Sequence, residues 1–295
     1  MNLKDEFIEY RNTLDLPGDI TFGIEIEYEN IKKDYMDYYI YDLKQNKIIG
    51  DWKNKEEIDI SEYDSKGNLI NGEVTSPILT DNINSWKELK KVVEVIDKNN
   101  GIITDRCGTH INIGAQIMGG NSIYWRNFLL LWILYEDEIY KFCSGEFSMV
   151  RKRKKTIDPI SSSLDISKIL DVKEPSANYI YYITDALLDK THDISLKNVY
   201  SYCFNKDNVI EFRLPNGTIK EEIIQNYINF FAKFLIVSKK ELDIDKILYN
   251  IKNNIRDNSL CDYVFEEEID KQNFLIQASK QNKVYSKKLP SHLHF

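Results

Sequence analysis

Residues 22–28 read Phe22-Gly23-Ile24-Glu25-Ile26-Glu27-Tyr28, in which apolar side chains alternate with acidic or small ones. Because successive side chains of a β-strand point to opposite faces, a strand here has one apolar face and one acidic face. The apolar face holds Phe22, Ile24, Ile26 and Tyr28, and the acidic face holds Gly23, Glu25, Glu27 and Glu29. Neighbours on one face lie about 7 Å apart, so the carboxylates repel each other unless water or a counter-charge intervenes.

Two interpretations of this strand are open. It could be an amphipathic edge strand whose acidic face is simply solvated, since charge clusters of this kind are common in proteins. It could also be a metal-binding strand, because Mg²⁺ prefers carboxylate oxygens and binds phosphates together with them. The rest of the sequence has to distinguish these interpretations.

The composition is that of an ordinary globular protein. The chain has 295 residues, of which 42% are hydrophobic and 29% are charged, enough for one large domain or two small ones. The net charge of −8 argues against a dedicated nucleic-acid-binding protein. Four cysteines lie far apart without a C-x-x-C pair, so we expect reduced thiols and neither a zinc motif nor a disulfide framework.

The sequence pattern predicts neither a signal peptide nor a membrane-spanning helix. The first residues, MNLKDEFIEYR, include no apolar segment of a signal peptide, and the longest apolar run, residues 128–134, is too short to cross a bilayer. We therefore expect a cytoplasmic protein without membrane contact.

Hydrophobic periodicity predicts a mixed α+β chain. Helical spacing predicts helices over residues 2–15, 83–99 and 122–142, a capping box at Thr218-Ile219-Lys220-Glu221 predicts another, and residues 241–281 are expected to form two more. Besides 22–28, strands are predicted over residues 35–43, 47–52, 72–77, 107–113 and 209–214.

Three of these later strands share the design of the first one, with an apolar face and a chemically active face. Glu73 lies on the polar face of residues 72–77, His110 and Asn112 on that of residues 107–113, and Glu211 and Arg213 on that of residues 209–214. Singly, a histidine is more often structural and a Glu-Arg pair more often a surface pair. Their recurrence on several strands favours a site that holds divalent metal ions and a phosphoryl group.

Common nucleotide and hydrolase signatures do not occur in the chain. It has no G-x-x-x-x-G-K-[ST], no G-x-G-x-x-G, no kinase motif set, no serine elbow and no H-E-x-x-H. A metal and phosphate site on an antiparallel sheet is the interpretation that remains.

Five motifs in order carry a resemblance to a known family. They are FGIEIE, the DIS of residues 59–61, GEVTSP, CGTHINIG and IEFRLPNGT, and together they span about residues 20–235. In this order and spacing they resemble the putative amidoligase family, carboxylate-amine ligases related to glutamine synthetase and glutamate-cysteine ligase. The resemblance implies a curved antiparallel sheet that cradles ATP and two or three Mg²⁺ ions, with helices packed on its outer face.

The resemblance also implies roles for individual residues. Glu25 and Glu27 match the paired metal-binding glutamates, and Glu73 and Glu211 match further metal ligands. His110 matches a histidine near metal and ATP phosphate, and Arg213 the phosphate-stabilising arginine. The remaining matches are Asp59, in a D-x-S element whose acid lies near the amine site in glutamine synthetase, and Arg151, which falls where relatives often carry a substrate or phosphate arginine. Asn112 stands where relatives commonly have a second histidine; it can still bind a phosphate oxygen but cannot be protonated.

The expected activity is therefore an ATP-dependent ligation of a carboxylate to an amine through an acyl phosphate, with Glu27, Arg213 and Asp59 as catalytic residues. The substrates could be small molecules, peptides or proteins. The rivals are a phosphotransferase or metal-dependent hydrolase on the same cradle, and an inactive nucleotide-binding module. We expect a catalytic domain over residues 1–240 with a substrate-facing insertion at 140–200, a helical extension at 241–281 and a basic tail at 282–295.

Overall fold

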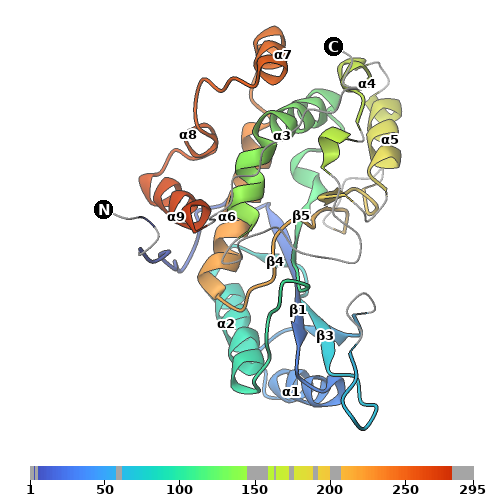
Figure 1. The fold of residues 1–295 in the computed structure, drawn as a ribbon, viewed down its shortest axis with the longest axis vertical. Helices are drawn as coiled ribbons and strands as arrows, with labels where there is room; N and C mark the ends of the chain where they lie inside the picture. The colour runs from blue at the N-terminus through green and yellow to red at the C-terminus, as the bar shows by residue number, and fades with distance from the viewer. Residues whose placement is uncertain are drawn as a thin grey trace.

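A computed structural model describes residue 3 and residues 6–57, 62–144, 159–162, 164–172, 176–188, 192–199 and 207–280. A single open antiparallel sheet runs through it (Figure 1). Its strand order is β2-β3-β1-β5-β7-β6, and β4 also pairs with β1. The strands are β1 Thr21–Glu29, β2 Lys53–Lys55, β3 Asn71–Thr75, β4 Leu79–Thr80, β5 Thr109–Gly114, β6 Ile194–Ser195 and β7 Val209–Phe212. The predicted mixed α+β class with an antiparallel sheet is confirmed.

Helices and strands do not alternate regularly along the chain. They are α1 Lys33–Gln45, α2 Ile83–Lys98, α3 Ser122–Cys143, α4 Ile166–Leu170, α5 Ser176–Ala186, α6 Glu221–Val237, α7 Ile244–Asn253, α8 Leu260–Val264 and α9 Glu268–Ser279. Short 3-10 turns occur at Ala115–Ile117 and Ile160–Ser162. Among the described residues, no helix is both long enough and apolar enough to cross a membrane.

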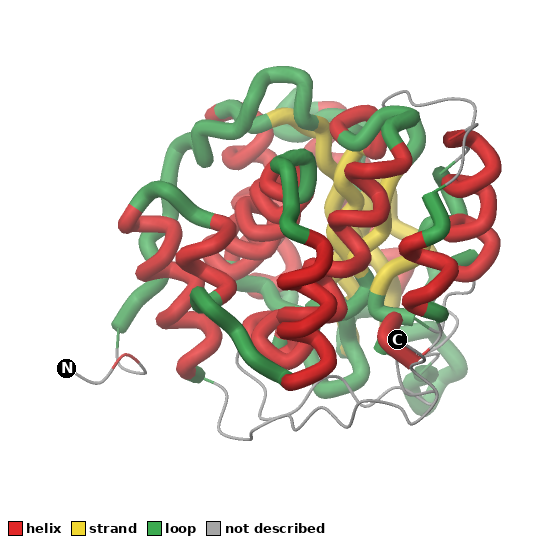
Figure 2. Tube along the Cα trace, turned by 90° about the horizontal axis from the view of Figure 1, so that it is seen from above, coloured by secondary structure: helices red, strands yellow, loops and turns green. Residues whose placement is uncertain are grey.

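The apolar face of the sheet packs against a layer of helices (Figure 2). Phe22 of β1 stacks on Trp86 of α2, with ring centroids 5.1 Å apart. Phe212 of β7 stacks on Phe231 of α6 at 4.0 Å and on Trp132 of α3 at 5.7 Å. Fully burying an aromatic side chain contributes about 1.5–3 kcal/mol, so these contacts fix the sheet on the helices. The opposite face of the sheet carries the polar residues.

The predicted helix over residues 2–15 is wrong for the described residues 6–15, which form an irregular strap. Their amide groups donate hydrogen bonds to distant side chains instead of to carbonyls four residues back. Glu9 donates to Asn273, Arg11 to Gln225 and Leu14 to Asp81. These acceptors lie 67 to 264 residues away in the sequence, so helical spacing alone cannot show them.

The predicted strand over residues 35–43 is also wrong, because this segment belongs to helix α1. Its tyrosines favoured a strand, but β-propensity is strongly dependent on context. In the structure Met36 and Ile40 are buried four residues apart, whereas Tyr35, Tyr38 and Tyr41 are exposed. Burial of one apolar stripe at helical spacing therefore favours a helix over a strand in this segment. Residues 47–52 form turns instead of a strand, and β2 begins after them.

Three helix boundaries differ from the prediction. Helix α6 begins at Glu221 and Lys220 is its N-cap, so Thr218 does not form the predicted capping box. The hydroxyl of Thr218 accepts a hydrogen bond from the Lys220 amide instead. Asn121, not Ser122, caps helix α3. Residues 241–280 hold three helices, α7, α8 and α9, where two were predicted.

Candidate active site

The register of the sheet brings the predicted site residues onto one face. The directly opposite pairs are Glu27 with Glu73, Glu25 with His110, and Asn112 with Glu211. Because directly opposite residues of neighbouring strands project to the same side, these side chains share the face that is turned away from the helices. Alternation along β1 places Gly23 on this face as well.

His110 lies at the centre of the carboxylates. Its Nδ1 is 3.1 Å from Oε2 of Glu25 and 3.7 Å from Oε1 of Glu211. Its Nε2 is 3.5 Å from Oε1 of Glu27. The imidazole is buried.

The ligand-type atoms fall into two groups that share His110. One group is Glu25, His110 and Glu211, and the other is Glu27, Glu73 and His110. Within each group the ligand atoms lie within 4.8 Å of one another, close enough for one ion to contact them all after small side-chain movements. Carboxylate oxygens with one imidazole nitrogen form a donor set that suits Mg²⁺ or Mn²⁺.

Arg213 follows strand β7 and is almost completely buried. Its guanidinium forms a close ion pair with Glu211, and its backbone amide donates to the carbonyl oxygen of Asp193 at 2.8 Å. The Nε atom is buried and has no hydrogen-bond partner among the described residues. Because a buried donor without a partner is costly, this nitrogen is a candidate donor to an anionic ligand.

Two glutamates of the acidic face have raised pKa values, because burial and neighbouring carboxylates disfavour their charged forms more than the nearby cations favour them. Burial and the carboxylate of Glu211 raise the pKa of Glu25. Burial, followed by the charges of Glu25 and Glu57, raises the pKa of Glu73 to about 8. A bound divalent cation would reverse these shifts, because it favours the ionised carboxylates.

Glu29 lies at the end of the same row but is neutralised by the protein itself. Its Oε2 accepts a hydrogen bond from Arg106 at 2.8 Å, and its Oε1 accepts one from the hydroxyl of Thr104 at 2.9 Å. Arg106 also pairs with Glu62. The acidic row of β1 therefore divides into two glutamates in the cluster and one structural glutamate.

Parts of two sequence motifs hold the fold together. Residues at the start of the CGTHINIG motif, where β5 begins, and residues at the end of the IEFRLPNGT motif, after β7, are joined by backbone and side-chain hydrogen bonds. Gly217 donates its amide to the Cys107 carbonyl at 2.9 Å, and Thr218 donates its amide to the hydroxyl of Thr109 at 3.1 Å. These bonds fix the position of His110 relative to Glu211.

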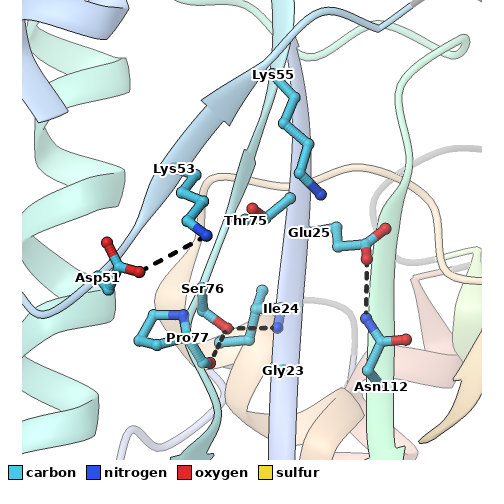
Figure 3. Close-up of a pocket in the computed structure, with 10 residues that line it drawn as sticks. All are labelled: Gly23, Ile24, Glu25, Asp51, Lys53, Lys55, Thr75, Ser76, Pro77 and Asn112. Atoms are coloured by element: carbon cyan, nitrogen blue, oxygen red, sulfur yellow. Dashed lines mark hydrogen bonds and ion pairs between the residues drawn. The ribbon is translucent and has the colours of Figure 1, made fainter. Parts of the chain in front are cut away.

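A pocket of about 260 Å³ opens beside the carboxylates (Figure 3). Glu25 and Asn112 line one side, and the amide of Asn112 donates to Oε1 of Glu25 at 3.1 Å. Lys53 and Lys55 of β2 line the other side. Neither lysine is among the site residues predicted from the sequence, although the alternation Lys53-Asn54-Lys55 indicates that both belong to one face.

Two predicted site residues, Asp59 and Arg151, lie outside the described residues. So do residues 145–158, 163, 173–175, 189–191 and 200 of the predicted insertion, and the whole of the predicted basic tail at 282–295. The structure therefore brings together Glu25, Glu27, Glu73, His110, Asn112, Glu211 and Arg213.

Fold and site define a mixed α+β protein whose antiparallel sheet carries a buried carboxylate and histidine cluster beside a buried arginine. Residues 20–235 match the model of a family described as putative amidoligase enzyme, and the chain belongs to this family. The match covers β1 to α6 and includes every described member of the cluster. Family membership indicates an enzyme of ligase type. No curated protein matches the chain by sequence.

Proposed function

We propose that the chain is an ATP-dependent carboxylate-amine ligase that forms an amide bond through an acyl phosphate. Its sheet would then be the curved cradle of the glutamine synthetase and glutamate-cysteine ligase type. The observation that carries the proposal is the convergence of four glutamates, one histidine and one arginine on a single sheet face. Membership of the amidoligase family supports the reaction type.

The residues of the cluster fit Mg²⁺ by their donor chemistry. Glu25 and Glu211 would hold one ion, and Glu27 and Glu73 another. A proton on Nδ1 of His110 would be donated to the Glu25 carboxylate, which lies 3.1 Å away, and Nε2 would then be the ligand atom. His110 would thus bind the ion held by Glu27 and Glu73. When bound, Mg²⁺ would neutralise phosphate charge during transfer.

The reaction has two steps. A carboxylate oxygen of the first substrate attacks the γ-phosphorus of ATP. The bond between this phosphorus and the oxygen that bridges it to the β-phosphate breaks. ADP departs, and the first substrate is now an acyl phosphate. The nitrogen of an amine then attacks the acyl carbon, phosphate leaves with the electron pair of the broken C–O bond, and the nitrogen loses a proton. The products are an amide, ADP and phosphate.

The side chains of the chain have separate roles in these steps. Arg213 would stabilise the negative charge of the transferring phosphoryl group, through the Nε donor that lacks a partner among the described residues. Glu27 holds its carboxylate in place by accepting a hydrogen bond from the Gly108 amide at 2.7 Å. By the family resemblance, Asp59 would lie near the amine and accept its proton, and Arg151 would bind substrate or phosphate.

The test is product formation with ATP, Mg²⁺ and panels of carboxylates and amines. A ligase produces ADP only together with an equal amount of a new amide, which is recognised by its mass. Glu27→Gln preserves an acceptor for Gly108 but removes the charge, so we expect it to lower turnover at least about a thousandfold in a folded protein. Near wild-type product formation by Glu27→Gln would contradict the assignment.

The same experiment separates the rival functions. ADP formation without an amide, with phosphate transferred to another acceptor or to water, would indicate a phosphotransferase or a hydrolase. ATP binding without consumption would indicate an inactive module. Asn112, which cannot be protonated, is the residue that motivates this last alternative. Its hydrogen bond to Glu25 at 3.1 Å, however, orients a carboxylate of the cluster, which favours an active enzyme.

A further inference from the structure

Strand β2 adds two positive charges to the active face. In the register of the sheet, Lys53 lies opposite Thr75, which lies opposite Glu25. Lys55 lies opposite Glu73, which lies opposite Glu27. Both lysines therefore extend rows that contain the carboxylates, and both line the pocket beside them (Figure 3).

Within the described part of the chain, neither lysine has a close ion-pair partner. There, the closest carboxylate oxygen to Nζ of Lys53 is 3.6 Å away, on the exposed Asp51. Nζ of Lys55 is 3.9 Å from Oε1 of Glu73, beyond hydrogen-bond distance. The two side chains are 63% and 53% exposed. Exposed pairs of this length contribute little to stability, so these contacts leave both ammonium groups accessible to a ligand in the pocket.

The floor of the pocket is kept low by a glycine. Gly23 occupies the place in the β1 row where Glu25 and Glu27 project side chains. A Cβ built on Gly23 would be in ordinary contact with Asn112 at 3.5 Å and with Ser76 at 3.7 Å, so neither backbone conformation nor crowding requires glycine here. Glycine within a strand often marks a place where a ligand approaches the backbone closely.

We propose that Lys53 and Lys55 bind the phosphates of ATP that are not transferred, with Gly23 as the floor beneath them. This assignment rests on the proposed function, because it extends the phosphate site from the carboxylate cluster toward β2. Lys55, in the row of Glu73 and Glu27, contacts the phosphate next to the cluster. Lys53, one row further along β2, contacts the next phosphate.

A polyphosphate explains the pair better than the acceptor carboxylate does. Two lysines that are two residues apart on one strand have their Cα atoms about 7 Å apart, a spacing that serves two linked anionic groups. A single carboxylate would need one cation or an arginine fork. The pocket also borders Glu25 directly, so an anion in it would adjoin a phosphoryl group bound at the carboxylate cluster.

The experiment is calorimetric titration of the full chain with ADP, tripolyphosphate and adenosine, each with Mg²⁺. The variants are Lys53→Met and Lys55→Met, with Lys53→Arg and Lys55→Arg to restore the charge. Lys240→Met is the matched control, because this lysine is 56% exposed and has a single ion pair at 3.5 Å, but lies outside the pocket.

We expect each methionine variant to weaken ADP and tripolyphosphate binding about tenfold, as for the loss of one charge-assisted hydrogen bond, and the arginine variants to recover most of it. Adenosine binding should not change. Unchanged ADP affinity in both methionine variants, or an equal loss in Lys240→Met, would overturn the assignment.

The outcome is distinguishable from failure of the ligase proposal. If the wild type forms an amide but the lysine variants bind ADP normally, only the lysine assignment fails. If ADP binding depends on the lysines but no amide forms, the lysine assignment stands and the ligase proposal fails. A raised KM for the acceptor with an unchanged KM for ATP would assign the lysines to the acceptor and overturn the phosphate assignment.

Discussion

Glu27 of β1 and Glu73 of β3 are directly opposite each other in the sheet, and both side chains are buried. Like charges in directly opposite positions destabilise a sheet. The pKa of Glu73 is raised to about 8, chiefly by burial, then by the charges of Glu25 and Glu57, and less by that of Glu27, so in the metal-free protein a proton on Glu73 would reduce this repulsion. A bound cation would remove the repulsion without the proton.

This relationship predicts how the stability of the metal-free protein depends on pH. The pKa of Glu73 is about 8 in the folded state and near 4.5 when unfolded, so between these values the folded state binds more protons. The free energy of unfolding therefore falls as pH rises through this window. In EDTA, the melting temperature should fall between pH 5.5 and 8.5, by about 2–4 °C for each kcal/mol lost.

Magnesium and a variant test the origin of this slope. If Mg²⁺ is the ligand of the cluster, it would bind the ionised carboxylates, so its stabilising effect should grow with pH. Glu73→Gln should reduce the slope in EDTA, leaving the part that Glu25 and the buried Asp193, whose pKa values are also raised, contribute. A wild-type slope in Glu73→Gln would show that another group titrates.

Glu29 should behave differently from its neighbours in the row. Glu29→Gln removes the charge that pairs with Arg106, and we expect it to lower the free energy of unfolding by about 1–3 kcal/mol. Chemical denaturation measures this loss. The affinity of the Glu29→Gln variant for divalent cations should stay within about twofold of the wild type, since Arg106 already neutralises Glu29. A tenfold loss of metal affinity would place Glu29 in the metal site.

Asn112 should act by orienting Glu25. Asn112→Ala removes the hydrogen bond to Oε1 of Glu25, and loss of a group that orients a metal ligand typically costs about 10–100-fold in affinity. We therefore expect Mg²⁺ to bind at least about tenfold more weakly, measured by calorimetry. Asn84→Ala, on the exposed first turn of α2, is the control. Wild-type affinity in Asn112→Ala would mean that Glu25 needs no such support.

Gly217 should be required for the fold and not for the chemistry. A Cβ at this position would lie 2.7 Å from Cγ2 of Ile103 and 3.0 Å from the backbone carbon of Cys107. Gly217→Ala should therefore destabilise the protein by about 1–3 kcal/mol. Gly18→Ala, whose Cβ would meet no atom within 4 Å, should be neutral in the same melting experiment. Equal melting temperatures of Gly217→Ala and the wild type would show that the segment around Gly217 can move to accommodate the added Cβ.

The sequence predicted the core of the site because period-two alternation is local. Each strand that carries Glu25, Glu73, His110 or Glu211 has its own apolar face, so each could be recognised without its neighbours. The register that places Glu27 opposite Glu73 was not in the local pattern. It comes only from the structure.

The failures of prediction have a common physical cause in long-range partners. The strap over residues 6–15 depends on acceptors such as Asp81 and Asn273, which no local window contains. Helix α1 depends on the burial of Met36 and Ile40 against the rest of the chain. The pairing of Arg106 with Glu29 likewise joins residues 77 positions apart.

Titration with Mn²⁺, followed by electron paramagnetic resonance, tests the convergence of the carboxylates most directly. Mn²⁺ takes the oxygen-rich sites of Mg²⁺ and can be counted when bound. We predict two sites per chain, one for each group around His110, with at least about tenfold weaker binding at one of them in Glu27→Gln and in Glu73→Gln. Both variants binding Mn²⁺ as the wild type does would contradict a metal centre on this sheet.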